Sequence, residues 1–126
     1  MLFFVTVSLF TVSCSKDDMS IEGKTYASME WHWDYYNNRY YEYDVIRFIS
    51  STDFEISTRY DDPYGPTIGS INTGKYIYSY PNLKIEYTTT TSSGTTTDHT
   101  MEFVFLNKNV FRYTSENGKV YDYVLQ

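Results

Sequence analysis

The stretch FVFLNKNVFRYTSENGKVYDYVL, residues 103–125, decides the fold because aromatic residues recur in it at every second position. Alternation with a period of two is typical of β-strands that bury one face. Two breaks interrupt the pattern, one at Asn107-Lys108-Asn109 and one that contains Asn117-Gly118. Asn and Gly favour tight turns. The stretch therefore predicts three consecutive antiparallel strands joined by short hairpins.

The second of these hairpins has two competing registers. A two-residue type I′ turn would set Arg112 opposite Tyr123. A three-residue loop with Gly118 in a left-handed bulge would set Arg112 opposite Asp122 and place the aromatics of both strands on one face. We predict the second register, because it agrees with the preceding hairpin and a one-residue slip would exchange the two faces. The pairs predicted for the two hairpins are Phe105 with Phe111, Phe103 with Tyr113, Tyr113 with Tyr121, and Phe111 with Tyr123.

Turn signals recur along the chain from residue 23 onward, with alternating segments between them. This spacing predicts an all-β fold, an up-and-down meander of about eight antiparallel strands that closes into a barrel and so removes both sheet edges. The hairpin IRFISSTDFEI pairs Phe48 with Phe54, Ile46 with Ile56, and Arg47 with Glu55. The break at Pro81-Asn82 pairs Tyr80 with Leu83, Tyr78 with Ile85, and Tyr76 with Tyr87. The predicted strands are 24–33, 40–49, 54–60, 70–80, 83–91, 98–106, 110–115 and 120–125.

The same alternation assigns a set of apolar and aromatic residues to the inner face of the barrel. An eight-stranded barrel either is filled by its own side chains or holds one small ligand. The bulk of these residues favours a filled interior, and a ligand pocket remains the alternative. The predicted inner face comprises Ile46, Phe48, Phe54, Ile56, Tyr76, Tyr78, Tyr80, Leu83, Ile85, Tyr87, Met101, Phe103, Phe105, Phe111, Tyr113, Tyr121, Tyr123 and Leu125.

Length and charge narrow the classes of function. The chain has 126 residues, enough for one domain, and a net charge of −6. An acidic chain repels phosphate backbones, so we expect no nucleic-acid partner. One cysteine excludes an internal disulfide and a zinc site built from several cysteines.

The apolar run LFFVTVSLFTVS, residues 2–13, is shorter than the 20 or so residues of a membrane-spanning helix and suits a secretory signal core. Its end, Thr11-Val12-Ser13-Cys14, resembles the lipobox of bacterial lipoproteins. The following residues, Ser15, Lys16, Asp17 and Asp18, resemble the export signal that sends lipoproteins of the Bacteroidetes to the outer face of the outer membrane. The resemblance implies a signal peptide over 1–13 and a lipidated tether over 14–22, with acyl chains such as palmitate on Cys14 as the membrane anchor. The alternative is a buried strand with a free thiol.

Residues 23–126 form the predicted barrel domain. GKTYAS at Gly23–Ser28 and the hairpins IRFISSTDFEI and GKYIYSYPNLKIEY are similar to segments of lipocalin-like lipoproteins. This resemblance implies a small lipocalin-like barrel that binds a ligand.

The candidate ligand-binding residues lie in WHWDYYNNRYYEY, residues 31–43, where seven aromatics occur in thirteen positions. Aromatic faces stack on sugar rings, and the amides and acids between them hydrogen-bond hydroxyl groups. The alternative is a long hairpin whose aromatics pack on each other and cap the barrel. We select Trp31, Trp33, Tyr35 and Tyr36 as contact residues.

No segment carries the pattern of an active site. His32 and His99 have no neighbouring residues that complete a metal set, and YDDPYGP at 60–66 lacks the spaced ligands of a calcium loop. The tract TTTTSSGTTTDH, residues 88–99, predicts a long polar hairpin, with a site for O-linked sugar as the alternative. We therefore expect no catalysis, metal or cofactor. The sequence favours a non-enzymatic surface lipoprotein that binds a glycan or a small amphipathic ligand. The alternative is an envelope accessory or inhibitor protein that docks on another protein.

Overall fold

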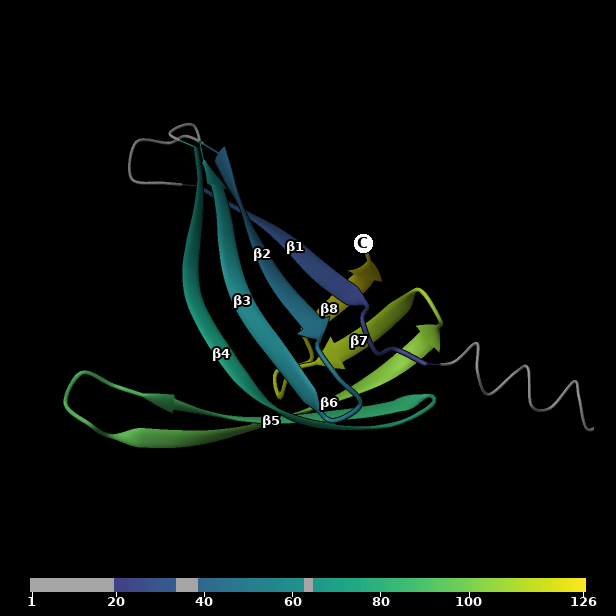
Figure 1. Ribbon diagram of the computed structural model, residues 1–126. Coiled ribbons are helices and arrows are strands. Elements are labelled where there is room, and N and C mark those ends of the chain that lie inside the picture. Colours follow the sequence, from purple (N-terminus) through teal and green to yellow (C-terminus); the bar gives the residue numbers. More distant parts are fainter. Residues whose placement is uncertain (1–19, 34–38, 63–64) are drawn as a thin grey trace, which may run out of the picture.

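The protein is an all-β barrel of eight antiparallel strands (Figure 1). The computed structural model describes residues 20–33, 39–62 and 65–126. Each strand pairs with its neighbour in sequence, and the last pairs with the first, which confirms the predicted lipocalin-like meander. Within the described ranges, no helix is long and apolar enough to cross a bilayer. The strands are β1 (Thr25–Trp33), β2 (Arg39–Phe48), β3 (Asp53–Asp62), β4 (Gly65–Ser79), β5 (Asn82–Thr90), β6 (Thr96–Asn107), β7 (Val110–Thr114) and β8 (Val120–Leu125).

The β7–β8 hairpin has the predicted register. Gly118 has a φ of 86°. Its N–H donates to the Ser115 carbonyl at 2.9 Å, and the Ser115 N–H donates to the Lys119 carbonyl at 2.8 Å. This is the three-residue loop with a left-handed glycine. Arg112 accordingly lies opposite Asp122 and donates two hydrogen bonds to its carboxylate, at 2.7 and 3.1 Å.

The β6–β7 hairpin shows a different turn around the predicted pair. Phe105 lies opposite Phe111 as expected, but Asn107 lies opposite Val110, so the ladder shifts by one residue at Leu106. The turn therefore contains Lys108 and Asn109, and the extra residue is a bulge in β6.

For the other two hairpins, the predicted register is confirmed between β2 and β3 and wrong between β4 and β5. Between β2 and β3, the pairs Phe48–Phe54, Ile46–Ile56 and Arg47–Glu55 are confirmed. Between β4 and β5, the prediction was wrong by two positions: the observed pairs are Tyr76–Ile85, Tyr78–Leu83 and Ser79–Asn82. The turn consists of Tyr80 and Pro81, joined by a cis peptide, and Asn82 already belongs to β5. A shift of two positions keeps every side chain on its predicted face.

An aromatic core fills one end of the barrel, which we call the base. Phe111 stacks on Tyr123 with ring centroids 5.0 Å apart and an interplanar angle of 6°. The predicted inner face is confirmed except for Tyr80, which is 38% exposed at the base. Two core residues were not predicted: Ile21, just before β1, and Tyr26, whose hydroxyl donates to the Lys108 carbonyl at 2.9 Å. Burial of each such side chain stabilises the fold by about 1.5–3 kcal/mol.

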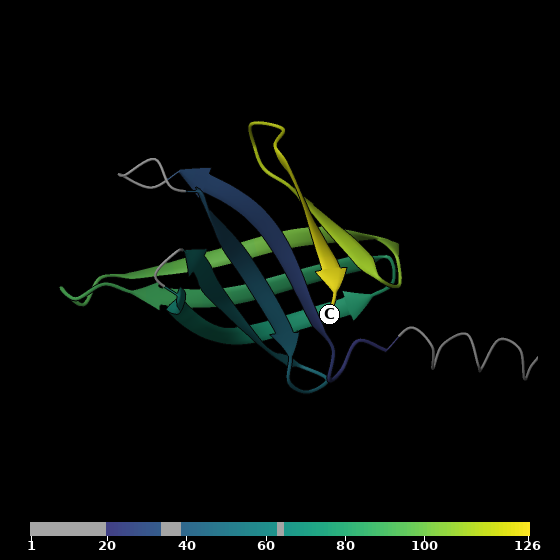
Figure 2. The same ribbon diagram turned by 90° about the horizontal axis from the view of Figure 1, so that it is seen from above.

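The barrel wall is continuous only near the base. The β1–β8 ladder consists of the pairs Tyr26–Leu125 and Ala27–Val124. The β4–β5 ladder begins at Gly74–Tyr87, and the β6–β7 ladder stops at Val104–Arg112. Beyond these points the β5–β6 and β7–β8 hairpins diverge from the β1–β4 sheet, as Figure 2 shows. We call this opposite, divided end the mouth.

Gly74 lies at the branch point where β4 leaves β5. A Cβ at this position would lie 2.0 Å from the Glu86 carbonyl oxygen, 2.8 Å from the Phe54 ring and 2.9 Å from the Tyr87 Cβ. Only a residue without a side chain lets β4 pass so close to both neighbours.

We therefore expect Gly74→Ala to lower the free energy of unfolding by about 1–3 kcal/mol, which is the usual cost of overpacking a core. Urea unfolding followed by circular dichroism measures this difference. Gly69→Ala is the matched control, because its nearest neighbour is the edge of the Tyr60 ring at 3.0 Å, which can rotate away. An equal loss in both variants would contradict the role assigned to Gly74.

Candidate functional site

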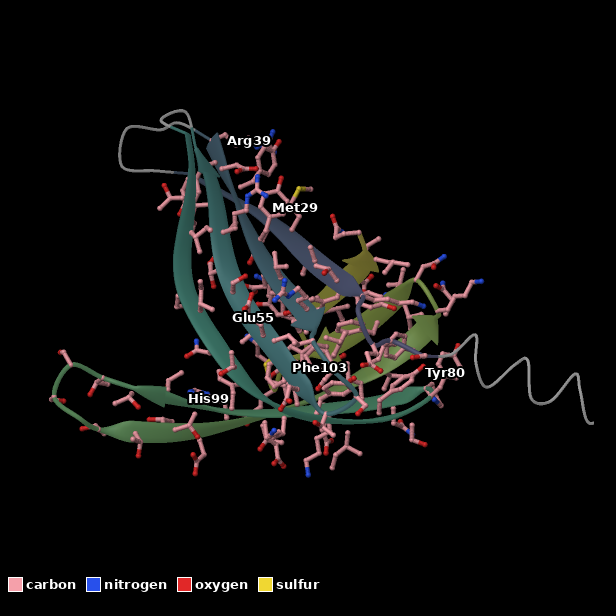
Figure 3. The ribbon with its side chains drawn as sticks, viewed as in Figure 1. Met29, Arg39, Glu55, Tyr80, His99 and Phe103 are labelled. Atoms are coloured by element: carbon pink, nitrogen blue, oxygen red, sulfur yellow. The ribbon has the colours of Figure 1, made fainter. Side chains whose placement is uncertain are left out.

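The interior of the barrel changes along every strand from a filled base to a solvent-accessible mouth. On β2, Ile46 and Phe48 are fully buried, whereas Asp44, on the same face, is partly exposed. On β6, Phe103 is buried and the inward-facing His99 is partly exposed. Figure 3 shows Phe103 among the packed side chains and His99 farther out on the β5–β6 hairpin. The core therefore closes one half of the interior and leaves the other half open to solvent.

Tyrosine rings and carboxylates line this open half. Strand alternation places their side chains on the same face as the core residues of the same strands. Tyr40 and Tyr60 have ring centroids 6.4 Å apart, and Tyr113 and Tyr121 have centroids 6.1 Å apart. We call this set the tyrosine mouth; it comprises Tyr40, Tyr60, Tyr87, Tyr113 and Tyr121 with Glu30, Glu42 and Asp44.

The Glu30 carboxylate is bound to a lysine. Lys119, at the end of the β7–β8 loop, forms an ion pair with Glu30 of β1. The Lys119 Nζ also lies 5.0 Å from the centroid of the Tyr121 ring, a cation–π distance. This pair joins β8 to β1 by side chains beyond the point where their backbone ladder ends.

Asp44 lies deepest of the three carboxylates. Burial raises its pKa above the ordinary 3.8, and the negative charges of Glu42 and Glu30 raise it further. The Thr58 hydroxyl, 3.5 Å from Asp44 Oδ1, acts in the opposite direction. Burial is also the main cause of the raised pKa of Tyr87, to which the charge of Asp44 contributes across the interior. The mouth is thus a region of negative potential enclosed by aromatic rings.

The His99 ring is held in place by neighbouring side chains of β5. It stacks on Tyr87 with centroids 4.8 Å apart, and its Nε2 lies 2.8 Å from the Thr89 hydroxyl. In the part of the chain that the structure describes, no three His, Cys, Asp or Glu side chains are arranged to hold a metal ion.

The Thr/Ser tract forms the predicted long polar hairpin. β5 extends to Thr90 and β6 begins at Thr96, and the Thr91 N–H donates to the Thr95 carbonyl at 2.9 Å. The threonine and serine side chains around this turn are exposed. O-linked sugar on them stays a prediction.

The residues selected from the sequence fall only in part within the described structure. Trp31 lies opposite Tyr41 and Trp33 opposite Arg39 in the β1–β2 ladder, which ends at the mouth. Tyr35 and Tyr36 lie outside the described residues, as do Cys14, Ser15, Lys16, Asp17 and Asp18.

Sequence reasoning assigned Tyr87, Tyr113 and Tyr121 to the inner face but did not select them as site residues. It counted Glu42 among the acids between the aromatics of residues 31–43 without selecting it as a contact residue, and it missed Asp44. Their signal was available: they occupy the inward phase of β2, continuing the alternation of Ile46 and Phe48 with acids. Acids at inward positions indicate that water reaches that part of the interior.

Comparisons with protein-family models, with curated proteins and with solved structures found no match to the chain.

We expect Asp44→Asn to stabilise the protein at pH 7. Because the folded state raises the pKa of Asp44, ionisation costs the native state more than the unfolded state, and this penalty is fully present above the folded pKa. Below the ordinary carboxyl range both states bind the proton and the penalty is absent. The melting temperature of the variant should therefore exceed that of the native chain at pH 7, and the difference should disappear at about pH 3.

Asp122 provides the control with the opposite sign. The Arg112 guanidinium holds the pKa of Asp122 below its usual range, so Asp122→Asn should lower the melting temperature at pH 7. If Asp44→Asn also lowers it, the carboxylate stabilises the fold and the analysis of the mouth is wrong.

Proposed function

We propose that the protein is a non-enzymatic lipoprotein, anchored at the outer membrane and exposed on the cell surface, that binds a glycan or a small amphipathic ligand at the tyrosine mouth. The observation that supports this most directly is the gradient of exposure inside the barrel. A barrel whose only task is stability would be filled along its whole length with apolar side chains. This one is filled at the base and lined by tyrosines and carboxylates at the mouth.

The chemistry of the mouth suits a ligand with both apolar faces and hydroxyl groups. Tyrosine rings offer flat apolar surfaces together with a polar hydroxyl. The carboxylates of Glu42 and Asp44 accept hydrogen bonds, as sugar recognition requires. The β1–β2 hairpin, with Trp31 and Trp33 in β1, ends beside this site.

The anchor rests on the sequence around Cys14. One acyl chain holds a protein at a membrane only marginally, whereas two or three hold it stably. In the proposed arrangement Cys14 carries the lipid, and residues 15–22 connect it to the domain. The described chain enters the barrel at the base, where Ile21 is buried, so the tether would join the domain at the end opposite the mouth.

A second candidate function is docking on another protein as an envelope accessory or inhibitor. The divided wall favours it, because diverging hairpins leave strand edges without a neighbour. In that case the tyrosine mouth would contact a protein surface and no small ligand would bind.

Glycan-array and lipid-extract binding by the full chain tests the first function. We expect Tyr60→Ala to weaken binding about tenfold, since the loss of one stacked aromatic at a binding site commonly has this effect. The double variant Trp31→Ala/Trp33→Ala should weaken it as well. Tyr80→Ala is the matched control, because Tyr80 is an exposed tyrosine at the base. No binding by the native chain would leave protein docking as the better function.

Cys14→Ser tests the anchor. We expect this variant to lose all incorporation of labelled palmitate and to leave the membrane fraction, because serine cannot form the thioether on which lipidation depends. Protease treatment of whole cells should degrade the native protein if it is exposed on the surface. Palmitate labelling that persists in Cys14→Ser would refute the proposed attachment.

A further inference from the structure

We propose that the ligand of the tyrosine mouth carries a primary ammonium group, which binds between Asp44 and Ser28 while the apolar part of the ligand lies against the tyrosine rings. This extends the function proposed above, on which it rests, by assigning the ligand to one chemical class. The class comprises small amphipathic amines and sugars that bear an amine.

The floor of the mouth is a row of three oxygen-bearing side chains across β1, β2 and β3. Ser28 lies directly opposite Asp44, and Asp44 lies directly opposite Thr58. Side chains opposite each other in antiparallel strands point to the same face, with Cβ atoms about 4.5–5.5 Å apart. One row nearer the base, Tyr26 and Ile46 are completely buried. The three oxygen-bearing side chains therefore lie directly above the aromatic core.

The Ser28 hydroxyl is buried without a hydrogen-bond partner among the described residues. Ser28 is 7% exposed, and within the ranges that the structure describes its hydroxyl forms no hydrogen bond. A buried hydroxyl without a partner is costly, and buried polar groups nearly always have one. Asp44, beside it in the same row, is partly exposed and can be reached from the mouth. A donor that binds Asp44 from the mouth would also supply the partner of Ser28.

The Asp44 carboxylate forms no ion pair with any residue in the described part of the chain. Its one hydrogen bond comes from the Thr58 hydroxyl at 3.5 Å. Arg47 and Arg59, the arginines on either side of it in the β2–β3 ladder, occupy the outward phase of their strands. A partly buried carboxylate is stabilised when a cation binds it. Asp44 therefore offers a negative charge to which a cationic ligand can bind.

Tyrosine rings from three strands surround this carboxylate. Burial raises the pKa of Tyr60, Tyr87 and Tyr123, and the negative charge of Asp44 raises the pKa of each further. Asp44 thus acts on side chains of β3, β5 and β8 across the interior. Aromatic faces attract cations, and a carboxylate repels anions. A ligand with an ammonium group next to an apolar part fits both features.

The mouth already holds one ammonium group by the same chemistry. Lys119 forms an ion pair with Glu30, and its Nζ lies 5.0 Å from the centroid of the Tyr121 ring. A carboxylate of β1 and a ring of β8 thus bind the lysine between them at the rim. Asp44 and the rings around it repeat this arrangement deeper in the mouth, with the Ser28 hydroxyl as a further acceptor. A primary ammonium has several N–H donors and can bond to both residues.

The test is an NMR titration of the full chain at neutral pH with phenethylamine, phenethyl alcohol and hydrocinnamate. These probes share a phenyl ring and carry a positive, a neutral and a negative group. We expect the amine to bind about tenfold more tightly than the alcohol, with shifts at Ser28 and Asp44, and the carboxylate not to bind. Glucosamine and glucose make the same comparison on a sugar. The pair that shows the larger preference for the amine identifies the source of the ammonium group.

Two variants test the residues. Asp44→Asn should weaken phenethylamine binding roughly 10–100-fold, because it removes a charged hydrogen bond, and Ser28→Ala should weaken it about fivefold. Since Asp44→Asn is expected to stabilise the protein at pH 7, its loss of binding would not come from unfolding. Neither variant should alter the affinity for phenethyl alcohol. Asp61→Asn is the matched control: it removes the same charge from the outer face of β3 and should bind the amine as the native chain does.

Three outcomes would overturn the inference. Equal affinity for the amine and its neutral counterpart, on both the phenyl and the sugar probes, would do so and leave the proposed function intact. Amine binding that persists unchanged in both Asp44→Asn and Ser28→Ala would place the ammonium elsewhere. Failure of every probe to bind would also overturn it, and the glycan-array and lipid-extract experiment would then decide separately whether the mouth binds a ligand.

Discussion

The ring of Phe111 holds the barrel together because it contacts aromatic rings from four other strands. Its centroid lies 4.8 Å from Tyr26 of β1, 6.3 Å from Phe48 of β2, and 5.0 Å from both Phe103 of β6 and Tyr123 of β8. The backbone ladder between β1 and β8 has only two residue pairs. Closure therefore depends more on rings packed at the base than on main-chain hydrogen bonds between the first and last strands.

This way of closing the barrel has a consequence at the other end. The longest strands, β4 and β6, extend well past the aromatic core. Beyond the core, the inward positions whose side chains the structure describes carry mainly acids and tyrosines, which retain water, in place of aliphatic and phenylalanine side chains that would draw the sheets together. The strands consequently diverge, and the wall separates between β4 and β5, between β6 and β7, and between β8 and β1. The filled base and the open mouth are thus two results of one distribution of apolar residues.

The sequence predicted those parts of the fold that alternation controls. Alternation of aromatic and polar residues predicted all eight strands and the faces of their side chains. At positions such as Phe111, Tyr121 and Tyr123 it also predicted the β7–β8 register. The β4–β5 register did not, because a shift by two positions leaves every face unchanged and the pattern cannot detect it. The role of Gly74 was also beyond prediction, since it depends on how closely three strands approach one another. Asp44 escaped notice because an acid on a strand is ordinarily assigned to its outer face.

The exposed strand edges and the acidic mouth follow the same physical logic. The carboxylate of Asp44 is tolerated despite its raised pKa, at an inward position where an apolar residue would stabilise the isolated domain better. An apolar residue at position 44 would extend the core and fill the mouth. One at position 102 would turn the edge of β6 into a surface for self-association. Asp44 therefore keeps the mouth open to solvent, and Glu102 keeps a charge on the edge of β6 beyond the point where its ladder with β7 ends.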